Sequence, residues 1–165
     1  MRQAGTGDIS AIRELAEIAF RHTYRDILSP EQMEYMMDMM YSEESLTRQM
    51  TAEGNTFFIE DGRGYVSFRR DGKTENGKDR FHLEKIYILP EFQRTGLGNA
   101  FFKKVCDSIL ELSPDSPLLE LNVNRDNPAV SFYEHLGMYK ARQGDFYIGN
   151  GFYMNDYIMA KTIEK

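Results

Sequence analysis

The sequence predicts a mixed α/β protein in which helices pack on one central sheet. Segments with helical spacing of apolar residues alternate along the chain with short runs that are typical of strands. The chain has 165 residues, which fits a single domain over residues 1–165. Hydrophobic residues make up 41% and charged residues 28% of the chain, which excludes a disordered or fibrous protein.

The first third of the chain predicts one strand and three helices. Ile9 and Ile12 begin an apolar stripe with helical spacing. Ser29 is a suitable N-cap, Pro30 suits the first helical position, and Ser42 is a second candidate N-cap. The expected segments are a strand at residues 1–4 and helices at residues 8–20, 30–40 and 42–50.

The rest of the chain predicts six strands and two helices. A polar stretch, residues 71–80, indicates a surface loop. Asn127 is the expected cap of the last helix, and Gly137 is its expected end. The expected strands are residues 56–60, 64–70, 82–89, 118–123, 139–148 and 152–161, and the expected helices are residues 96–112 and 127–137.

Charge and composition exclude several classes of partner. The net charge of −6 disfavours nonspecific binding to nucleic acid. Cys106 is the only cysteine, so no disulfide forms within the chain. The three histidines show no metal-ligand spacing. Because residues 1–10 lack the apolar core of a signal peptide and no run has the length of a membrane span, we expect a cytoplasmic protein with no membrane partner.

A glycine-containing loop follows the strand at residues 82–89. Residues 91–95 lead to Gly96-Leu97-Gly98, where a helix begins. The first turn of a helix has unpaired N–H groups, so an anion can bind there. A Walker A loop is excluded because no Gly-Lys-Ser/Thr is present, and a Rossmann fingerprint from Gly96 would require Gly or Ala where Phe101 stands. On these residues alone, a phosphate loop and an ordinary turn both remain open.

Two motifs resemble the GNAT superfamily of acetyl-CoA-dependent N-acetyltransferases. They are QRTGLG at residues 93–98 and NPAVSFYEHLGM at residues 127–138. Their order and separation fit, and the resemblance covers nearly the whole chain. It implies the GNAT fold, with a mixed, mostly antiparallel central sheet that splays between the fourth and fifth strands and is flanked by helices. The segments LEKIYILPEFQRTGLG and DFYIGNGFYMNDYIMAK also resemble polyamine acetyltransferases of the bacterial PaiA type.

The resemblance implies acetyl-CoA as the cosubstrate, with no metal. Backbone amides of residues 94–98 would hold the pyrophosphate of coenzyme A. The main chain of Tyr87 and Ile88 would pair with pantetheine as an extra strand, and the Ile88 amide would face the thioester carbonyl. Asn127 would bind pantetheine, cap its own helix, or do both. The implied cofactor-binding residues are Tyr87, Ile88, Gln93, Arg94, Thr95, Gly96, Leu97, Gly98, Asn99, Asn127 and Tyr133.

Glu84 and Tyr133 are the candidate catalytic residues. Strand alternation puts Glu84 on the same face as Ile88, and Lys85 and Tyr87 on the other face. Glu84 could accept the proton of the acceptor amine through water, or it could simply pair with a surface cation. The resemblance implies a tyrosine hydroxyl near the coenzyme sulfur, which Tyr133 would supply as an acid. Its alternative role is that of a core aromatic residue.

The acceptor is expected to be a small amine. Six carboxylates occur without an intervening Lys or Arg, and an acidic groove would attract a polyamine. A solvated helix face is the other explanation for these carboxylates. The methionines in the same stretch of the chain could line a binding surface, the core or a homodimer contact. Acetylation of a protein N-terminus or lysine is an alternative function, as is a noncatalytic coenzyme A-binding module. The six carboxylates are Asp26, Glu31, Glu34, Asp38, Glu43 and Glu44.

Overall fold

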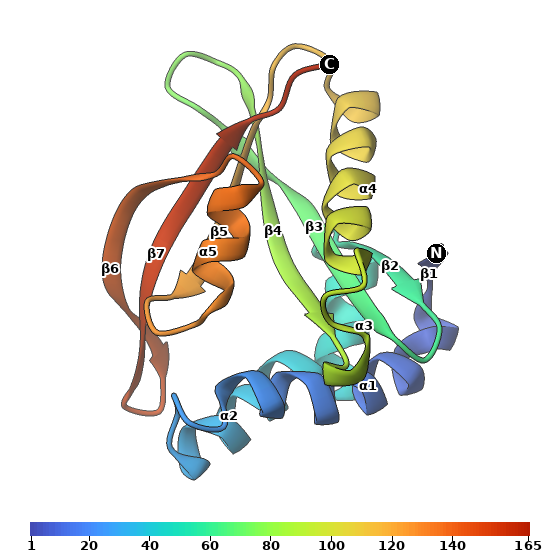
Figure 1. The fold of residues 1–165 in the computed structure, drawn as a ribbon, viewed down its shortest axis with the longest axis vertical. Helices are drawn as coiled ribbons and strands as arrows, with labels where there is room; N and C mark the ends of the chain where they lie inside the picture. Colours follow the sequence, from blue (N-terminus) through green and yellow to red (C-terminus); the bar gives the residue numbers. More distant parts are fainter. The chain divides into compact units, whose positions relative to one another are not determined.

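Seven strands form one mixed sheet with the hydrogen-bonded order β1-β2-β3-β4-β5-β7-β6. The structure, a computed structural model, describes residues 1–165 (Figure 1). Its elements group into two compact units. The first unit contains Met1–Arg70 and Glu84–Val105, and the second contains Asp71–Leu83 and Cys106–Lys165. The predicted mixed α/β class is confirmed.

The first unit contains three helices beside the first strands. Ser29 Oγ accepts a hydrogen bond from the Gln32 N–H at 3.1 Å, and Ser42 Oγ accepts one from the Ser45 N–H at 3.1 Å, so both predicted caps are confirmed. A short 3₁₀ turn, Thr6–Asp8, precedes the first helix. The elements are β1 Arg2–Ala4, α1 Ile9–Tyr24, α2 Pro30–Tyr41, α3 Glu43–Thr51 and β2 Thr56–Glu60.

Three further elements cross the boundary between the units. They are β3 Gly64–Lys73, β4 Asp79–Ile88 and α4 Leu97–Leu112. Strands β1, β2 and β3 pair antiparallel in chain order. Large side chains fill the core of the first unit, and the fully buried ones include Phe20, Tyr41, Leu46, Phe57, Tyr65 and Phe101.

The prediction of a surface loop over residues 71–80 is largely wrong. β3 continues to Lys73 and β4 begins at Asp79, so only a tight turn separates the two strands. The Lys78 N–H donates to Thr74 Oγ1 at 3.0 Å, and Gly77 has a φ of 82°, which favours glycine. Polar composition misled the prediction, because a hairpin end that is exposed needs backbone pairing but no apolar alternation.

The second unit contains the remaining strands and the last helix. They are β5 Leu118–Asn124, α5 Ala129–His135, β6 Tyr139–Gly149 and β7 Phe152–Thr162. The final hairpin is confirmed: β6 pairs antiparallel with β7, and the three turn residues have positive φ. β7 also pairs antiparallel with β5 along the whole of β5.

β4 and β5 form the parallel pair of the sheet. Their ladder comprises Arg80 to Leu83 on β4 and Leu118 to Leu121 on β5. Both strands continue beyond the ladder, β4 to Ile88 and β5 to Asn124. The predicted splay between the fourth and fifth strands is thereby confirmed.

Candidate functional site

The predicted site residues fall into two groups, one in each unit. Residues 84–99 lie in the first unit, at the end of β4 and the start of α4. Asn127 and Tyr133 lie in the second unit, before and within α5. The geometry of each group is described within its own unit.

The last five residues of β4 form a strand with one paired edge. On the β3 side, the Leu89 N–H that follows β4 donates to the Arg63 carbonyl at 2.8 Å. Gly64 permits this close pairing, because a Cβ atom there would lie 2.6 Å from the Tyr87 carbonyl oxygen. On the β5 side, the ladder includes no residue of β4 after Leu83. An extended ligand can add to such an edge through main-chain hydrogen bonds.

One face of this strand segment packs against the helices of the first unit. The Tyr87 ring lies 5.5 Å from the Phe20 ring of α1 and 5.9 Å from the Tyr65 ring, measured between centroids. Lys85 Nζ donates a hydrogen bond to Gln49 Oε1 of α3 at 2.7 Å. Lys85 and Tyr87 thus share a face, as strand alternation predicts, and Glu84 belongs to the other face.

Glu84 is half-buried and forms an ion pair. Arg69 Nε of β3 donates to Glu84 Oε1 at 2.5 Å. The cation partner that the sequence left open is therefore present. Arg69 therefore occupies one of the two carboxylate oxygens of Glu84.

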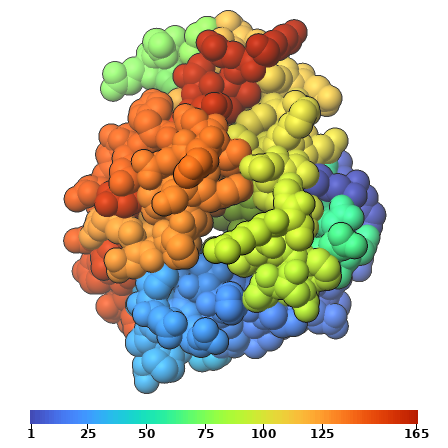
Figure 2. Space-filling view, viewed as in Figure 1, coloured from blue at the N-terminus to red at the C-terminus, as the bar shows by residue number.

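Hydrogen bonds within the loop between β4 and α4 fix its course. This loop lies at the surface, in the yellow-green part of Figure 2. Gln93 Nε2 donates to the Ile88 carbonyl at 3.2 Å, and Thr95 Oγ1 donates to the Phe92 carbonyl at 2.6 Å. Both side chains therefore stabilise the loop itself.

The start of α4 presents free backbone donors. The first intrahelical bond runs from the Ala100 N–H to the Gly96 carbonyl at 3.0 Å, so the N–H groups of residues 97–99 have no helical acceptor. Arg94 and Gly96 have φ values of 62° and 88°, which bend the loop sharply before the helix. A Cβ atom on Gly96 would meet no atom within 4 Å. Open space beside free N–H groups fits the diphosphate of coenzyme A.

In the second unit, Asn127 and Tyr133 both have structural contacts. Asn127 Oδ1 accepts a hydrogen bond from the Ala129 N–H at 2.8 Å, so the predicted cap is present. Tyr133 is only 6% exposed, and its ring centroid lies 5.4 Å from that of Phe132. Gly137 ends the helix with a φ of 90°. A role of Asn127 or Tyr133 toward the cosubstrate stays a prediction.

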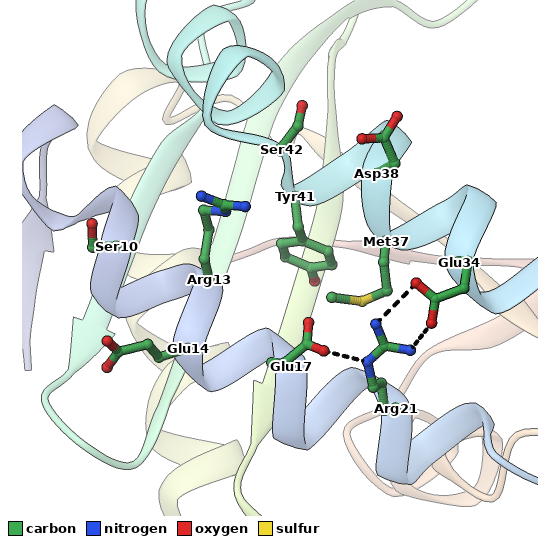
Figure 3. A pocket seen from close by; sticks show the side chains of 10 residues that line it. All are labelled: Ser10, Arg13, Glu14, Glu17, Arg21, Glu34, Met37, Asp38, Tyr41 and Ser42. Atoms are coloured by element: carbon green, nitrogen blue, oxygen red, sulfur yellow. Dashed lines mark hydrogen bonds and ion pairs between the residues drawn. The ribbon is translucent and has the colours of Figure 1, made fainter.

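A cavity of about 480 Å³ lies between α1 and α2 in the first unit. Figure 3 shows Arg21 between two carboxylates, with Nε 2.7 Å from Glu17 and Nη1 2.5 Å from Glu34. One carboxylate of the acidic stretch, Glu34, is thus neutralised by Arg21 of α1, a cation from outside that stretch. The lining residues are Ser10, Arg13, Glu14, Glu17, Arg21, Glu34, Met37, Asp38, Tyr41 and Ser42.

The buried lysine of β4 was not predicted as a special residue. Lys85 is 7% exposed, and burial lowers its pKa to about 8. Its ammonium lies 5.6 Å from the centre of the Tyr41 ring. The signal in the sequence is a lysine on the inward face of an apolar strand. The structure contains no group of three or more His, Cys, Asp or Glu side chains that could hold a metal ion, and no helix long and apolar enough to cross a membrane.

Comparison with known proteins identifies the family. The sequence model of the acetyltransferase (GNAT) domain matches residues 24–161. The chain belongs to the GNAT acetyltransferase family. It is 27% identical over 153 residues to the uncharacterized N-acetyltransferase YuaI of Bacillus subtilis, covering 90% of this chain and 84% of that protein.

Solved GNAT structures share this fold. The PaiA N-acetyltransferase of Thermoplasma acidophilum, in complex with coenzyme A, superposes with a TM-score of 0.73 at 22% identity, over 98% of this chain and 96% of that one. The ribosomal-protein-S18-alanine N-acetyltransferase of Escherichia coli superposes with a TM-score of 0.67 at 20% identity, over 99% and 93% of the chains. As a GNAT acetyltransferase, this chain is an acyltransferase that uses acetyl-CoA as its cosubstrate.

Proposed function

We propose that this GNAT acetyltransferase transfers the acetyl group of acetyl-CoA directly to a primary amine of a small molecule, with polyamines as the preferred acceptors. The observation that carries the proposal is the free edge of residues 84–88, which leads into a sharply bent loop with unpaired N–H groups at the start of α4. That arrangement suits a ligand with an extended arm and a diphosphate, as coenzyme A has. All of residues 1–165 would form the one transferase domain.

The backbone of the first unit would hold the cosubstrate. The main chain of Ile88 would pair with pantetheine, because that of Tyr87 faces β3, and N–H groups of residues 94–99 would hold the diphosphate. When bound, acetyl-CoA supplies an acetyl thioester that an amine can attack. The Ile88 N–H would donate a hydrogen bond to the thioester carbonyl oxygen, where negative charge develops during attack. Most of the rate enhancement would come from holding amine and thioester together.

Side chains would carry out the proton transfers. An alkyl amine with a pKa near 10.4 is charged at neutral pH and must lose a proton before it can attack. Glu84 would accept that proton through water, because Arg69 occupies one of its oxygens. As the C–N bond forms and the C–S bond breaks, the Tyr133 hydroxyl would give its proton to the leaving sulfur, and the second proton that the nitrogen loses on becoming an amide would restore that hydroxyl. No residue needs to carry the acetyl group covalently.

The charge of the chain supports a cationic acceptor. The net charge is −6, and the cavity between α1 and α2 contains four carboxylates and two arginines. Such a surface raises the local concentration of a polycation. The similarity to PaiA is in keeping with this acceptor class, whereas the similarity to the S18-alanine enzyme supports the alternative, a protein N-terminus or lysine.

A turnover screen tests the proposal. Thiol release from acetyl-CoA would be measured with spermidine, spermine, diamines, aminoglycosides and short peptides, and acceptors would be ranked by kcat/KM. We expect polyamines to exceed peptides by at least tenfold. Higher kcat/KM for a peptide N-terminus would establish the alternative function. Tight binding of acetyl-CoA without turnover on any acceptor would contradict acetyl transfer to amines of either class.

A further inference from the structure

One buried carboxylate in the second unit forms no ion pair. Asp156 of β7 is 5% exposed, and its Oδ1 is buried without a hydrogen bond. Its Oδ2 accepts a hydrogen bond from Asn122 Nδ2 at 3.3 Å, which is long for this contact. Burying a carboxylate without full compensation costs free energy, so an uncompensated one calls for an explanation beyond folding.

Glu120 is a second buried carboxylate of the same sheet, and it serves as a comparison for Asp156. Glu120 and Asn124 lie on one face of β5, and Asp156 shares that face because it pairs with Asn124. Glu120 Oε2 lies 2.9 Å from Arg142 Nη1, an ion pair although not a well-aligned hydrogen bond. Arg80 Nε lies 3.7 Å from the other oxygen, Oε1. The buried carboxylate of Glu120 therefore forms ion pairs, whereas that of Asp156 forms none.

Arg125 is the cation whose charge acts on Asp156, but its guanidinium is hydrogen-bonded elsewhere. Arg125 Nη2 donates to Asp145 Oδ1 at 2.7 Å, and its Nη1 donates to the Gly144 carbonyl at 3.3 Å. Gly144 is the residue of β6 that pairs with Asp156. The guanidinium is thus held on β6 while the carboxylate beside it stays unpaired.

Small and polar residues lie beside Asp156 on its face of the sheet. Asn122, whose side chain donates to Asp156, is exposed. Gly144 has no side chain, and the end of the Phe146 ring closes over it, 3.0 Å from where a Cβ atom would lie. Asp156 pairs with Asn124, the last residue of β5, and so lies at the carboxyl end of that strand, where open α/β sheets bind their ligands.

We infer that Asp156 binds a positively charged amine of the acceptor, with Asn122 as its neighbour. The bound amine is the distal one, because the reacting amine must be neutral while a carboxylate retains an ammonium. Asn122 donates through its Nδ2, so its carbonyl oxygen remains available as a second acceptor for the N–H groups of an ammonium. The acceptor class is accordingly an alkyl diamine or longer polyamine.

Two further observations agree with a cationic ligand. Burial raises the pKa of Asp156, an effect that an ammonium beside the carboxylate would reverse. A metal ion is a poor alternative, because no group of three or more His, Cys, Asp or Glu side chains is present. Water is the remaining alternative, and it predicts no dependence on the charge of the acceptor.

The inference rests on the proposed function, and its test separates the two. The acceptors are 1,4-diaminobutane and 1-butylamine, which have the same chain length but differ by one ammonium. The variants are Asp156→Asn and the control Asp126→Asn, which removes an exposed carboxylate near the same end of β5. We expect Asp156→Asn to lower kcat/KM for the diamine by ~10- to 100-fold, mainly through KM, in line with loss of a charge-assisted hydrogen bond. For butylamine, and for Asp126→Asn with either amine, we expect less than about a twofold change.

Each result decides between the possibilities. Equal effects of Asp156→Asn on both amines, or equal effects of the two variants, would overturn the inference while the proposed function stands. If the wild-type protein acetylates neither amine, calorimetric titration with 1,4-diaminobutane replaces turnover. Binding that Asp156→Asn abolishes would then support the amine site without the proposed reaction, and absence of binding to the wild-type protein would overturn it. An unchanged affinity for acetyl-CoA verifies that each variant is folded.

Discussion

Several candidate functional side chains also have a structural partner, and this governs how their substitutions will behave. Asn127 caps α5 through the Ala129 N–H, and Glu84 pairs with Arg69. Removing such a side chain changes stability and chemistry together. The most informative substitutions therefore remove one atom and keep the shape of the side chain.

Tyr133→Phe is such a substitution. It deletes the hydroxyl and keeps the ring. Because Tyr133 is only 6% exposed and its ring contacts that of Phe132, this packing survives the substitution. If the hydroxyl protonates the leaving sulfur, kcat falls by roughly 100-fold while KM for acetyl-CoA changes little. The measurement is steady-state kinetics with a saturating amine, alongside a thermal melt. An unchanged kcat in a folded variant would remove Tyr133 from the mechanism.

Lys85 makes stability depend on pH. In the folded protein its pKa is about 8, against 10.5 for an ordinary lysine, because burial disfavours the ammonium. Below pH 8 both folded and unfolded chains carry the proton, and the full cost of the buried charge is present. Between pH 8 and 10.5 the folded chain has released a proton that the unfolded chain still binds, so stability rises with pH, by roughly 1.4 kcal/mol per pH unit at most.

Lys85→Met isolates this effect. Tyr41 and Tyr65 are also buried, and burial raises the pKa of each, which acts in the opposite direction above about pH 10. The free energy of unfolding should therefore be compared between wild type and Lys85→Met by urea titration at pH 7 and pH 9.5. We expect the free energy of unfolding of the wild type, relative to that of Lys85→Met, to rise by ~2 kcal/mol between these two pH values. A constant difference would show that Lys85 keeps its proton over this range.

Local elements were predictable because their signals are local. The caps at Ser29 and Ser42 and the closing turn at residues 149–151 depend on side chains within a few positions of the backbone that they satisfy. The hairpin end at residues 71–80 was missed because pairing across strands leaves no apolar pattern when both faces are exposed. The extension of α1 from residue 20 to Tyr24 follows the buried stripe that Phe20 and Tyr24 continue.

The loop before α4 yields a test of cosubstrate binding at the scale of an element. Gly96→Ala strains a residue with a φ of 88° by ~1 kcal/mol and puts a methyl group into the open space beside the free N–H groups. Gly77→Ala is the matched control, because Gly77 has a φ of 82°, an equally open Cβ position and a place in the β3–β4 turn, outside the loop before α4.

Both variants should lose similar stability, but they should differ in ligand binding. We expect the Kd of acetyl-CoA, measured by calorimetry, to rise at least ~10-fold in Gly96→Ala, which corresponds to about 1.4 kcal/mol. Gly77→Ala should leave the Kd unchanged. Equal Kd values in the two variants would place the diphosphate elsewhere.

At the scale of the whole molecule, the pairings between distant segments could not be predicted. Two motifs in order, QRTGLG and NPAVSFYEHLGM, were enough to predict the GNAT fold. They contain nothing about Lys85 and Gln49, which are 36 positions apart, or about Asp156 and Asn122, which are 34 apart. Such pairs depend on strand register and helix packing, which a single sequence specifies only through the complete fold.

Net charge leads to a prediction for the whole chain. With a charge of −6, the protein attracts a trivalent cation such as spermidine more strongly than a monovalent amine, and added salt screens that attraction. Raising NaCl from ~20 to ~200 mM shortens the screening length from about 20 Å to about 7 Å. We expect KM for spermidine to rise several-fold and KM for butylamine to rise less than twofold, both measured at one pH. Both amines react at the same site. An equal rise in both KM values would therefore show that salt acts on the enzyme itself. Long-range attraction would then have no part in choosing the acceptor.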